Sequence, residues 1–512
     1  MIRARLYAAR RFAITGGTAG LLAVSLGAAA LQASPASAAT GNAASSGATP
    51  QSPASPAAGI IRPGQWAQVT TPLKGTAIIP QIGLARGRDG VLHVVWLNGA
   101  SPTFAIKDTP ITAGGRVGKP VTVASHWFLA TDPDATVTPD GVVALWNGIK
   151  TESGDESGTA TATRPLSGGP WKVSPTIIKA PTAAPDTGSP DTAATGSDGK
   201  PWIGFTGTDS LVVGHFGHPD VQLNPGKFAC CVLDVGLATD GKSGVTSLTY
   251  DSEITNHQGV FARPLAASGK AAGPARLLPG SVENKSSIVP EQKVGITGRG
   301  HGRAGTYVIY GAGWPTYHSF NVIKLGSRKV IKVARPSSAS DELAGADIAA
   351  DASGRLWVAW IEGDGGKPAL FVRRSNPSAG TFGATERVAL PKGTTTVFQV
   401  YINAVGGKAD VVALVARNNN ENQADYWATE VNPKLSLSAS RSSHGGAKVT
   451  LRVTDAGSSV RGATVRFCGH RASTGKTGRV TFRVHSISHG SATASAAKGG
   501  FAGTSVRVKA SC

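Results

Sequence analysis

The chain has 512 residues, of which 40% are hydrophobic and only 16% are charged, so it can bury a substantial core. Its 66 glycines and 31 prolines favour many short strands and tight turns over long helices. Outside the extreme N-terminus no segment keeps a helical hydrophobic period, which argues against a helical bundle.

Residues 1–38 have the three parts of a signal peptide. A basic head precedes the weakly apolar stretch 13–30, and Ala36-Ser37-Ala38 is a small-residue cleavage site. The head contains Arg3, Arg5, Arg10 and Arg11. Arg10-Arg11-Phe12 favours twin-arginine export, with Sec export as the alternative. No span of about 20 apolar residues follows residue 38, so we expect a secreted protein without a membrane span.

Residues 39–59 contain Ala, Ser, Gly and Pro, and they carry no charge. This composition predicts a disordered linker between the signal peptide and the first folded domain.

One phrase then occurs seven times: an apolar run, a turn of the Asp-Gly type, and a second apolar run. The second runs end at Trp96, Trp146, Phe205, Tyr250, Tyr310, Trp360 and Val415. We expect a two-residue hairpin turn at each Asp-Gly, and further strands follow most of the second runs. The turn aspartates Asp89, Asp140, Asp198 and Asp240 are 51, 58 and 42 residues apart. A four-stranded unit of about 40–50 residues is the blade of a β-propeller.

The seventh unit ends after its third strand, near Val431, whereas residues 61–73 form an unassigned strand ahead of the first unit. If this N-terminal strand completes the last blade, the ring closes and no open sheet edge remains. We therefore predict an all-β protein with a seven-bladed β-propeller over residues 60–432. A ring of six or eight blades would also fit the pattern.

Residues 433–512 have short strands separated by Gly/Ser turns, which predicts a small β-sandwich. Cys468 and Cys512 both lie in this segment, and export to an oxidising compartment predicts a disulfide between them. Cys230 and Cys231 are adjacent. They predict either a vicinal disulfide or two semi-buried thiols, and a redox role would follow only from a labile bridge.

Charge is concentrated in this C-terminal segment. The whole chain carries +20, of which the signal-peptide arginines contribute +4. Residues 433–512 have 13 Lys and Arg against one acid, Asp455, a net +12, which leaves only +4 for residues 39–432. This asymmetry indicates a polyanionic partner, and outside the cell an anionic cell-wall polymer or acidic polysaccharide fits better than nucleic acid. The alternative is a solvated basic surface that aids solubility.

Acidic residues stand just before the first strand of several units. They are Asp134, Asp191, Asp234, Glu291 and Asp347. Four of them precede a turn glycine by seven residues, which predicts a carboxylate ring at one mouth of the propeller. Such a ring could bind a ligand or a structural cation, or divide acid and base roles. Alternatively, each acid caps backbone N–H groups. We predict no other metal and no cofactor.

The loops after the second strands add polar and aromatic groups at the same mouth. These are Glu253, Trp314, Tyr317 and His318. Aromatic side chains beside acids can stack on a sugar and hydrogen-bond to it. Trp314 could equally pack against the neighbouring blade.

The repeated phrase resembles the secreted bacterial propellers of the sialidase-like type, and the resemblance is one of architecture. Asp351-Ala-Ser-Gly354-Arg-Leu-Trp357 is similar to an Asp box, with one extra residue before Gly and no leading Ser. Sialidase activity would imply a Tyr nucleophile with an acid partner, such as Tyr317 near Glu253 or Glu291.

Within 433–512, Gly462-Ala-Thr-Val465, Thr477-Gly-Arg-Val480 and Ala496-Ala-Lys-Gly-Gly-Phe501 resemble bacterial Ig-like and carboxypeptidase-regulatory-like modules. This resemblance implies an accessory role for the segment.

The sequence thus favours a secreted, monomeric propeller that binds an extracellular glycan at its funnel, with the basic sandwich attached to anionic polymers. A glycoside hydrolase that uses the funnel carboxylates is one alternative, and a protein-interaction scaffold is another.

Overall fold

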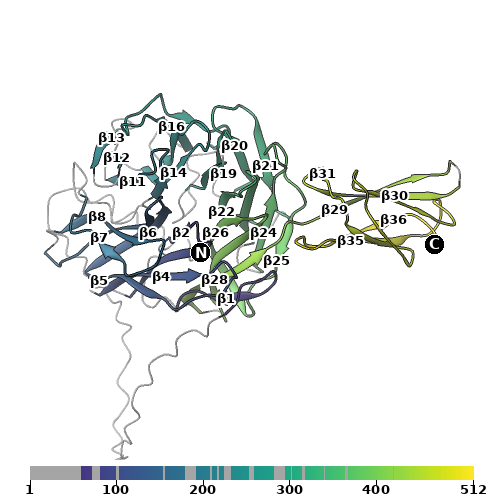
Figure 1. Cartoon of the computed structure of the whole chain (residues 1–512), viewed down its shortest axis with the longest axis horizontal. Coiled ribbons are helices and arrows are strands. Elements are labelled where there is room, and N and C mark those ends of the chain that lie inside the picture. Colours follow the sequence, from purple (N-terminus) through teal and green to yellow (C-terminus); the bar gives the residue numbers. More distant parts are fainter. Residues whose placement is uncertain are drawn as a thin grey trace, which may run out of the picture. The chain divides into compact units, whose positions relative to one another are not determined.

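The computed structural model describes residues 59–71, 81–99, 103–153, 156–178, 192–207, 210–215, 218–223, 232–252, 259–281, 294–300, 302–313, 317–338, 341–363, 367–418, 420–444 and 446–512. These residues form strands, turns and loops, and nine four-stranded sheets (Figure 1). Within these ranges no helix is long and apolar enough to cross a membrane. The predicted signal peptide and most of the predicted linker lie outside the described residues.

Seven of the sheets lie in the N-terminal part of the chain and are the blades of a propeller. Blade one contains β2 (Gly83–Arg86), β3 (Leu92–Asn98), β4 (Phe104–Ile111) and β5 (Val121–Trp127). Blade two contains β6 (Leu129–Val137), β7 (Gly141–Ile149), β8 (Ser157–Pro165) and β9 (Lys172–Val173). Blade three contains β10 (Thr192–Thr195), β11 (Pro201–Gly207), β12 (Ser210–His215) and β13 (His218–Leu223).

The remaining blades repeat this antiparallel order. Blade four contains β14 (Val232–Thr239), β15 (Thr246–Ser252), β16 (Gly259–Leu265) and β17 (Arg276–Leu277). Blade five contains β18 (Ile296–Gly298), β19 (Thr306–Ala312), β20 (Ser319–Lys324) and β21 (Val330–Ala334). Blade six contains β22 (Leu343–Ala350), β23 (Leu356–Glu362), β24 (Ala369–Arg374) and β25 (Glu386–Val388). Blade seven contains β26 (Thr394–Val405), β27 (Lys408–Arg417), β28 (Asn420–Val431) and β1 (Trp66–Gln68).

The second strand of a blade is the most deeply buried. The first six residues of β3, and all seven of β19 and β23, are buried, since these strands have neighbouring strands on both edges and neighbouring blades on both faces. This explains why the apolar run after each turn is nearly continuous and does not alternate. The outermost strands β9 and β17 have only two residues each, and these residues are exposed.

The turns between first and second strands are longer than predicted in several blades. Gly90, Gly199 and Gly354 have positive φ values of 81°, 76° and 70°, and each closes a four-residue turn by donating its N–H to the carbonyl three residues earlier. Such a turn followed by a left-handed glycine belongs to the longer hairpin loops. A two-residue turn is present at 138–141, where the N–H of Thr138 donates to the carbonyl of Gly141. The prediction of a two-residue hairpin turn at each Asp-Gly is therefore wrong, and Gly141 itself has no positive φ.

The predicted N-terminal strand completes the last blade. β1 pairs with β28 in antiparallel register, Trp66 opposite Thr429. The first strands contact one another in a closed cycle, from β2 through β6, β10, β14, β18, β22 and β26 back to β2. This cycle makes the seven sheets one ring.

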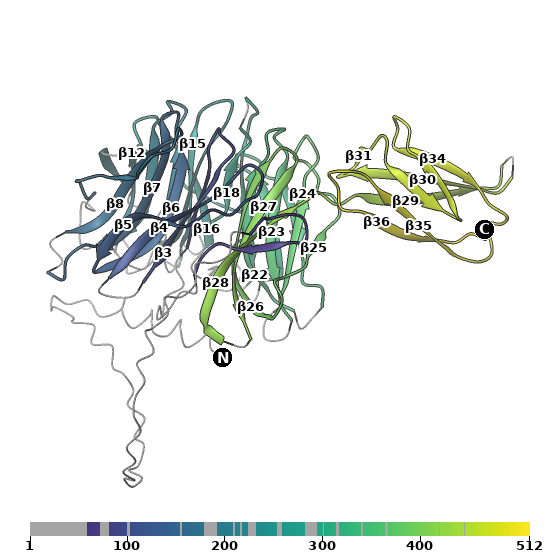
Figure 2. The ribbon, with the colours of Figure 1, turned by 60° about the horizontal axis from the view of Figure 1, so that its bottom comes forward.

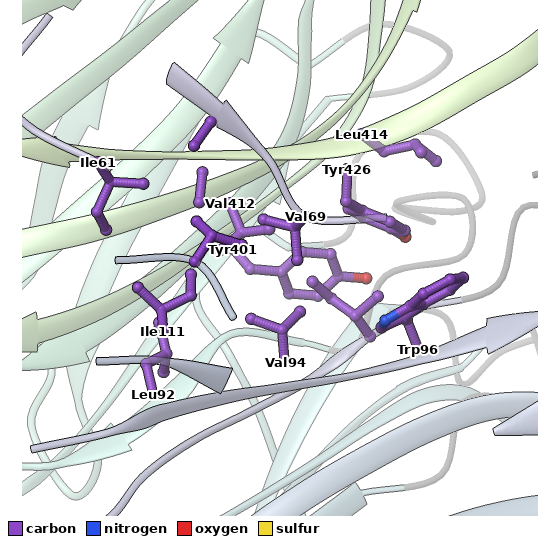
Figure 3. Close-up of a cluster of buried hydrophobic side chains, with 14 of the residues drawn as sticks. Ile61, Val69, Leu92, Val94, Trp96, Ile111, Tyr401, Val412, Leu414 and Tyr426 are labelled. Carbon is purple, nitrogen blue, oxygen red and sulfur yellow. The ribbon is translucent and has the colours of Figure 1, made fainter. Parts of the chain in front are cut away.

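Apolar side chains from both ends of the propeller sequence meet where the ring closes. Figure 3 shows Ile61 and Val69 of the N-terminal segment in one cluster with residues of blade one and of blade seven. Trp96 and Tyr401, one from each of these blades, are almost completely buried. Burial of such side chains is the main favourable contribution to closure.

The two remaining sheets form a sandwich. One contains β29 (Ser436–Ser442), β30 (Lys448–Asp455), β31 (Ser458–Ser459) and β34 (Arg479–Arg483). The other contains β32 (Thr464–Phe467), β33 (His470–Ser473), β35 (Ala492–Ala497) and β36 (Thr504–Val508) (Figure 2). Alternate residues of both sheets, among them Leu451 and Phe467, form a single buried cluster drawn from residues 435–510. Residues 56–512 make one compact unit, so a domain boundary at residue 433 stays a prediction, which this separate core supports.

The predicted disulfide is confirmed. Cys468, directly after β32, bonds to Cys512, 44 residues later, with a Cα–Cα distance of 5.3 Å. The bond ties the C-terminus to the sandwich core, against which Cys468 packs. Cys230 and Cys231 lie outside the described residues.

Candidate functional site

Equivalent positions on the first strands can be identified from strand pairing. In six blades the residue that precedes the aromatic end of the second run faces one residue of the first strand or, in blade five, the residue just before that strand. These residues are Gly83, Asp134, Thr192, Gly236, Gly295 and Asp347. We call them the inner-strand positions.

The carboxylates at two inner-strand positions join adjacent blades. Asp134 accepts a hydrogen bond from the N–H of Ala135, and its other oxygen accepts one from the N–H of Ala193 on the next blade, both at 2.8 Å. Asp347 likewise accepts from the N–H of Ile348 at 2.8 Å and from that of Ile402 on the next blade at 3.0 Å. Both side chains are buried. These bonds match the alternative prediction that the acids cap backbone N–H groups.

The other inner-strand positions join blades in related ways. The hydroxyl of Thr192 accepts a hydrogen bond from the N–H of Leu237 on the next blade at 3.3 Å. At Gly83 a Cβ atom would lie 2.4 Å from the backbone nitrogen of Ala135, so only glycine permits this close approach. The ring is therefore held by direct backbone packing in some blades and by side-chain acceptors in others.

Two parts of the predicted carboxylate register are wrong. Asp134, Asp234 and Asp347 lie inside β6, β14 and β22, not before them, because these strands continue past a β-bulge toward their N-terminal ends. Asp234 is also two residues ahead of the inner-strand position Gly236. The turn glycines used for counting are not equivalent, since Gly298 is the last residue of β18.

The remaining acids of the predicted ring cannot be placed. Asp191 and Glu291 lie outside the described residues, as do Glu253 and Trp314 of the loops. The ligand-binding role of all of these residues stays a prediction.

The loop before β20 contributes two of the predicted site residues, and they differ in exposure. Tyr317 is buried, and its ring lies 5.5 Å from that of Phe320. Its backbone forms an isolated bridge with Leu343 of the next blade. His318 is exposed, and its N–H donates to the carbonyl of Ala312 at 2.7 Å. Of this pair only His318 presents its side chain to solvent.

Sequence reasoning missed a buried polar group beside the closure of the ring. The side-chain oxygen of Gln399 accepts hydrogen bonds from the hydroxyls of Tyr426, at 2.6 Å, and Tyr401, at 3.2 Å. Figure 3 shows both tyrosines within the apolar cluster. Burial, reinforced by Tyr426 and by the carboxylates Asp347 and Asp132, raises the pKa of Tyr401 well above its ordinary value. A tyrosine so buried and so weakly acidic cannot serve as an accessible nucleophile in this conformation.

The turn that resembles an Asp box has a structural role. One carboxylate oxygen of Asp351 accepts from the backbone N–H groups of Ser353 and Arg355, at 2.9 and 3.1 Å. The other accepts from the indole N–H of Trp357 at 3.1 Å. The first Asp and the last Trp of the phrase are therefore the side chains that fix this turn.

Arginines on corresponding third strands also bind structural partners. A nitrogen of Arg164 lies 3.1 Å from the buried carboxylate of Asp108 on the preceding blade. Arg263 donates to the carbonyl of Gly273 at 2.9 Å. Arg373 donates to the carbonyl of Val333 on the preceding blade at 2.7 Å, and burial lowers its pKa. These contacts within the protein explain why arginine recurs on the third strands, so the recurrence does not require the carboxylate of a ligand.

The single acid of the sandwich contacts residues of the propeller. Asp455 is buried and contacts Arg355, at 2.8 Å, and Arg374, two residues of blade six. Burial lowers the pKa of Arg355, and the carboxylate of Asp455 opposes that effect. The guanidinium of Arg374 also lies over Trp357, 5.2 Å from the ring centroid. Among the described residues, the ion pairs of Asp455 are therefore with arginines of the propeller, although residues 433–512 contain 13 basic residues.

No cluster of three or more His, Cys, Asp or Glu side chains suited to a metal ion is present among the residues that the structure describes.

No family model matches the chain, and no curated protein sequence matches it. Among solved structures, the virginiamycin B lyase of Staphylococcus aureus is 12% identical, with 71% of this chain and 97% of the lyase covered and a TM-score of 0.42. The polysaccharide lyase Uly1 is also 12% identical, with 72% of this chain and 99% of the lyase covered and a TM-score of 0.41. The Hadza microbial sialidase Hz136 is 11% identical, with 68% of this chain and 64% of the sialidase covered and a TM-score of 0.37. Such low values carry no argument about activity, and the propeller assignment here follows from the strand pairings.

Proposed function

We propose that this chain is a secreted binding protein whose propeller holds an extracellular glycan and whose basic, Ig-like C-terminal domain attaches it to an anionic polymer. The observation that carries the proposal is the distribution of charge. Residues 433–512 have 13 Lys and Arg, and their one acid is buried against two arginines of the propeller. A surface with one sign of charge attracts and concentrates polymers of the opposite sign.

The disulfide between Cys468 and Cys512 is consistent with an oxidising, extracellular location. The signal-peptide pattern of residues 1–38 supports the same location. Outside the cell, acidic polysaccharides and cell-wall polymers are the abundant polyanions that such a domain would meet.

Binding is favoured over glycoside hydrolysis because of what the inner carboxylates contact. Asp134 and Asp347 each accept two backbone hydrogen bonds and are buried between blades. A general acid or nucleophile must reach the scissile bond of its substrate, which an acid in this position does not do.

The first experiment measures binding of the mature protein to insoluble cell-wall polysaccharide and to soluble acidic polysaccharides, as a function of salt. We expect binding that weakens steadily as salt rises, because the attraction between exposed charges is screened. Absence of binding at low salt would remove the proposed role of the basic domain.

A second experiment tests the enzyme alternative with a panel of chromogenic glycosides. We expect no turnover. Turnover that is abolished by Asp134→Asn or Asp347→Asn, in proteins that remain folded, would replace the binding proposal for the propeller by a hydrolase.

A further inference from the structure

One face of the C-terminal sandwich carries a regular array of cations and hydroxyls. In the sheet that contains β29, β30 and β34, Val449, Leu451, Val453 and Phe482 point into the buried core. Because side chains alternate along a strand, their neighbours point outward. Nine of the outward residues lie opposite one another across all three strands, and we call them the nine-residue face: Ser438, Ser440, Ser442, Lys448, Thr450, Arg452, Arg479, Thr481 and Arg483.

Strand register arranges this face in three rows. Ser438, Arg452 and Arg479 are opposite one another across the three strands. Ser442, Lys448 and Arg483 form the row at the other end. Between them lies a row of hydroxyls alone, formed by Ser440, Thr450 and Thr481, in which the two threonine hydroxyls are 2.8 Å apart.

The cations of this face are placed against each other. Arg452 faces Arg479 and Lys448 faces Arg483 directly across the same strand pair. Like charges in such positions destabilise a sheet. Three of these side chains are exposed and Lys448 is half-buried, and none of the four has an ion-pair partner within the residues that the structure describes. Folding does not account for this pairing, whereas an external anion would relieve it.

The distance between the two opposed cation pairs suits two anionic groups on one extended ligand chain. Strands of a sheet are about 4.8 Å apart, so each opposed pair of cations can bind one carboxylate or phosphate jointly. Along β30, Lys448 and Arg452 are four residues apart, which separates the two pairs by about 13 Å. The hydroxyl row lies between them, where it can exchange hydrogen bonds with sugar hydroxyls.

We propose that the nine-residue face binds a linear acidic polysaccharide lying along the strands, with Arg452/Arg479 and Lys448/Arg483 each holding an anionic group. This proposal rests on the proposed function of the basic domain and adds the face, the residues and the ligand class. The face contains no aromatic side chain, so it lacks the stacking platform of proteins that bind single-stranded nucleic acid. It also lacks exposed apolar residues of the kind that anchor a protein in a lipid interface.

The other sheet of the sandwich provides a matched control. There Arg466 on β32 faces Arg471 on β33, and both side chains are exposed. This outer face has one opposed pair, so it lacks the second pair and the hydroxyl row between two pairs. Arg452→Ser/Arg479→Ser and Arg466→Ser/Arg471→Ser therefore remove the same two charges by the same substitution from opposite sides of one domain.

The test is the affinity of the full mature protein for polygalacturonate at low salt, with fully methyl-esterified polymer, long-chain polyphosphate and duplex DNA as further probes. We expect about a tenfold loss of affinity in Arg452→Ser/Arg479→Ser and less than a twofold loss in the control. Thr450→Val/Thr481→Val should weaken polygalacturonate binding while leaving polyphosphate binding unchanged. The esterified polymer should not bind.

Equal losses in the two arginine variants would overturn the proposal, because binding would then depend on net charge alone. Binding of duplex DNA that is as tight as binding of polygalacturonate, or tighter, would overturn the proposal in favour of a nucleic-acid ligand. A wild-type protein that binds no polyanion would instead refute the proposed function itself. Thermal unfolding of each variant controls for folding, and removal of an opposed cation pair should not lower the midpoint.

Discussion

The propeller and the sandwich are both all-β, but the charged side chains of the two regions differ in their partners. In the propeller, charged side chains on neighbouring blades are paired or accept backbone hydrogen bonds, as in Arg164 with Asp108 and in Asp347 with Ile402. In the sandwich the single acid, Asp455, contacts the propeller, and the basic side chains of the nine-residue face have no ion-pair partner among the described residues. Polar groups in the first region therefore assemble a ring, and those in the second are available to a partner.

This contrast has a physical origin in how the two regions obtain stability. Seven blades bury a core at every blade interface, and side-chain acceptors such as Asp134 fix the register of one blade on the next. The sandwich has one core cluster within about 80 residues, and small domains of this kind depend on additional constraints such as disulfides.

The largest expected effect is removal of the disulfide by Cys468→Ser/Cys512→Ser. Closing a segment of 44 residues restricts the unfolded chain, so its loss should cost about 4 kcal/mol. All ten tryptophans precede residue 433, so tryptophan fluorescence reports on the propeller alone. We expect the circular-dichroism transition of the sandwich to move to lower denaturant by more than the fluorescence transition, which should move only by what the Asp455 contact contributes to the propeller. Equal shifts of the two transitions would contradict separate cores in the two regions.

The next effect concerns the contact between the regions. Asp455→Asn leaves Arg374, which is only 8% exposed, with Asp351 at 4.0 Å as its remaining ion-pair partner among the described residues, and breaking a buried pair in this way should cost about 3 kcal/mol. Because Arg374 lies over Trp357, the fluorescence transition should shift as well. The double variant Asp455→Leu/Arg374→Met should recover most of the loss. A loss below about 0.5 kcal/mol would mean that the pair is exposed in solution.

Within the propeller, Asp347→Ala removes the acceptor of two backbone N–H groups, one on its own blade and one on the next. Buried N–H groups left unsatisfied should cost about 2 kcal/mol, measured as the fluorescence transition in urea. Asp341→Ala, on the loop before β22, is the matched control and should change stability little. If Asp347→Ala is as stable as the wild type, water replaces the carboxylate as the acceptor of these two N–H groups.

A smaller effect is expected at alkaline pH. Burial raises the pKa of Tyr310 from 10.0 to about 12, and its hydroxyl donates to the carbonyl of Pro279 at 2.7 Å. The folded state therefore favours the protonated phenol. This contribution is complete below pH 10 and is lost as pH rises through about 12. Unfolding midpoints measured between these values should fall in the wild type and fall less in Tyr310→Phe, and parallel slopes would contradict the assignment.

The sequence predicted the architecture well because the repeated phrase is itself a structural unit. The aromatic ends at Trp96 and Trp360 mark buried second strands, and the leftover apolar segment before the first blade indicated the closing strand β1. The presence of two cysteines within one segment was sufficient to predict the disulfide between them.

The site was harder to predict because the register of a strand cannot be counted from a turn of variable length. Gly141 and Gly354 occupy different turn types, and Gly298 is inside a strand, so equal spacing did not mean equal position. The partners of Asp134 and Asp347 are backbone groups of another blade, for which no sequence pattern exists. In the sandwich, alternation within β30 and β34 was visible, but their pairing, which opposes the cations, required the structure.

The most direct test of the account compares equal charge losses in the two regions. Arg452→Ser/Arg479→Ser removes two cations from the sandwich, and Arg328→Ser/Lys329→Ser removes two exposed cations from a propeller loop. The quantity measured is the dissociation constant for polygalacturonate at low salt. We predict about a tenfold increase for the sandwich variant and no change for the propeller variant. Equal increases in the two variants would contradict the division of roles between the regions.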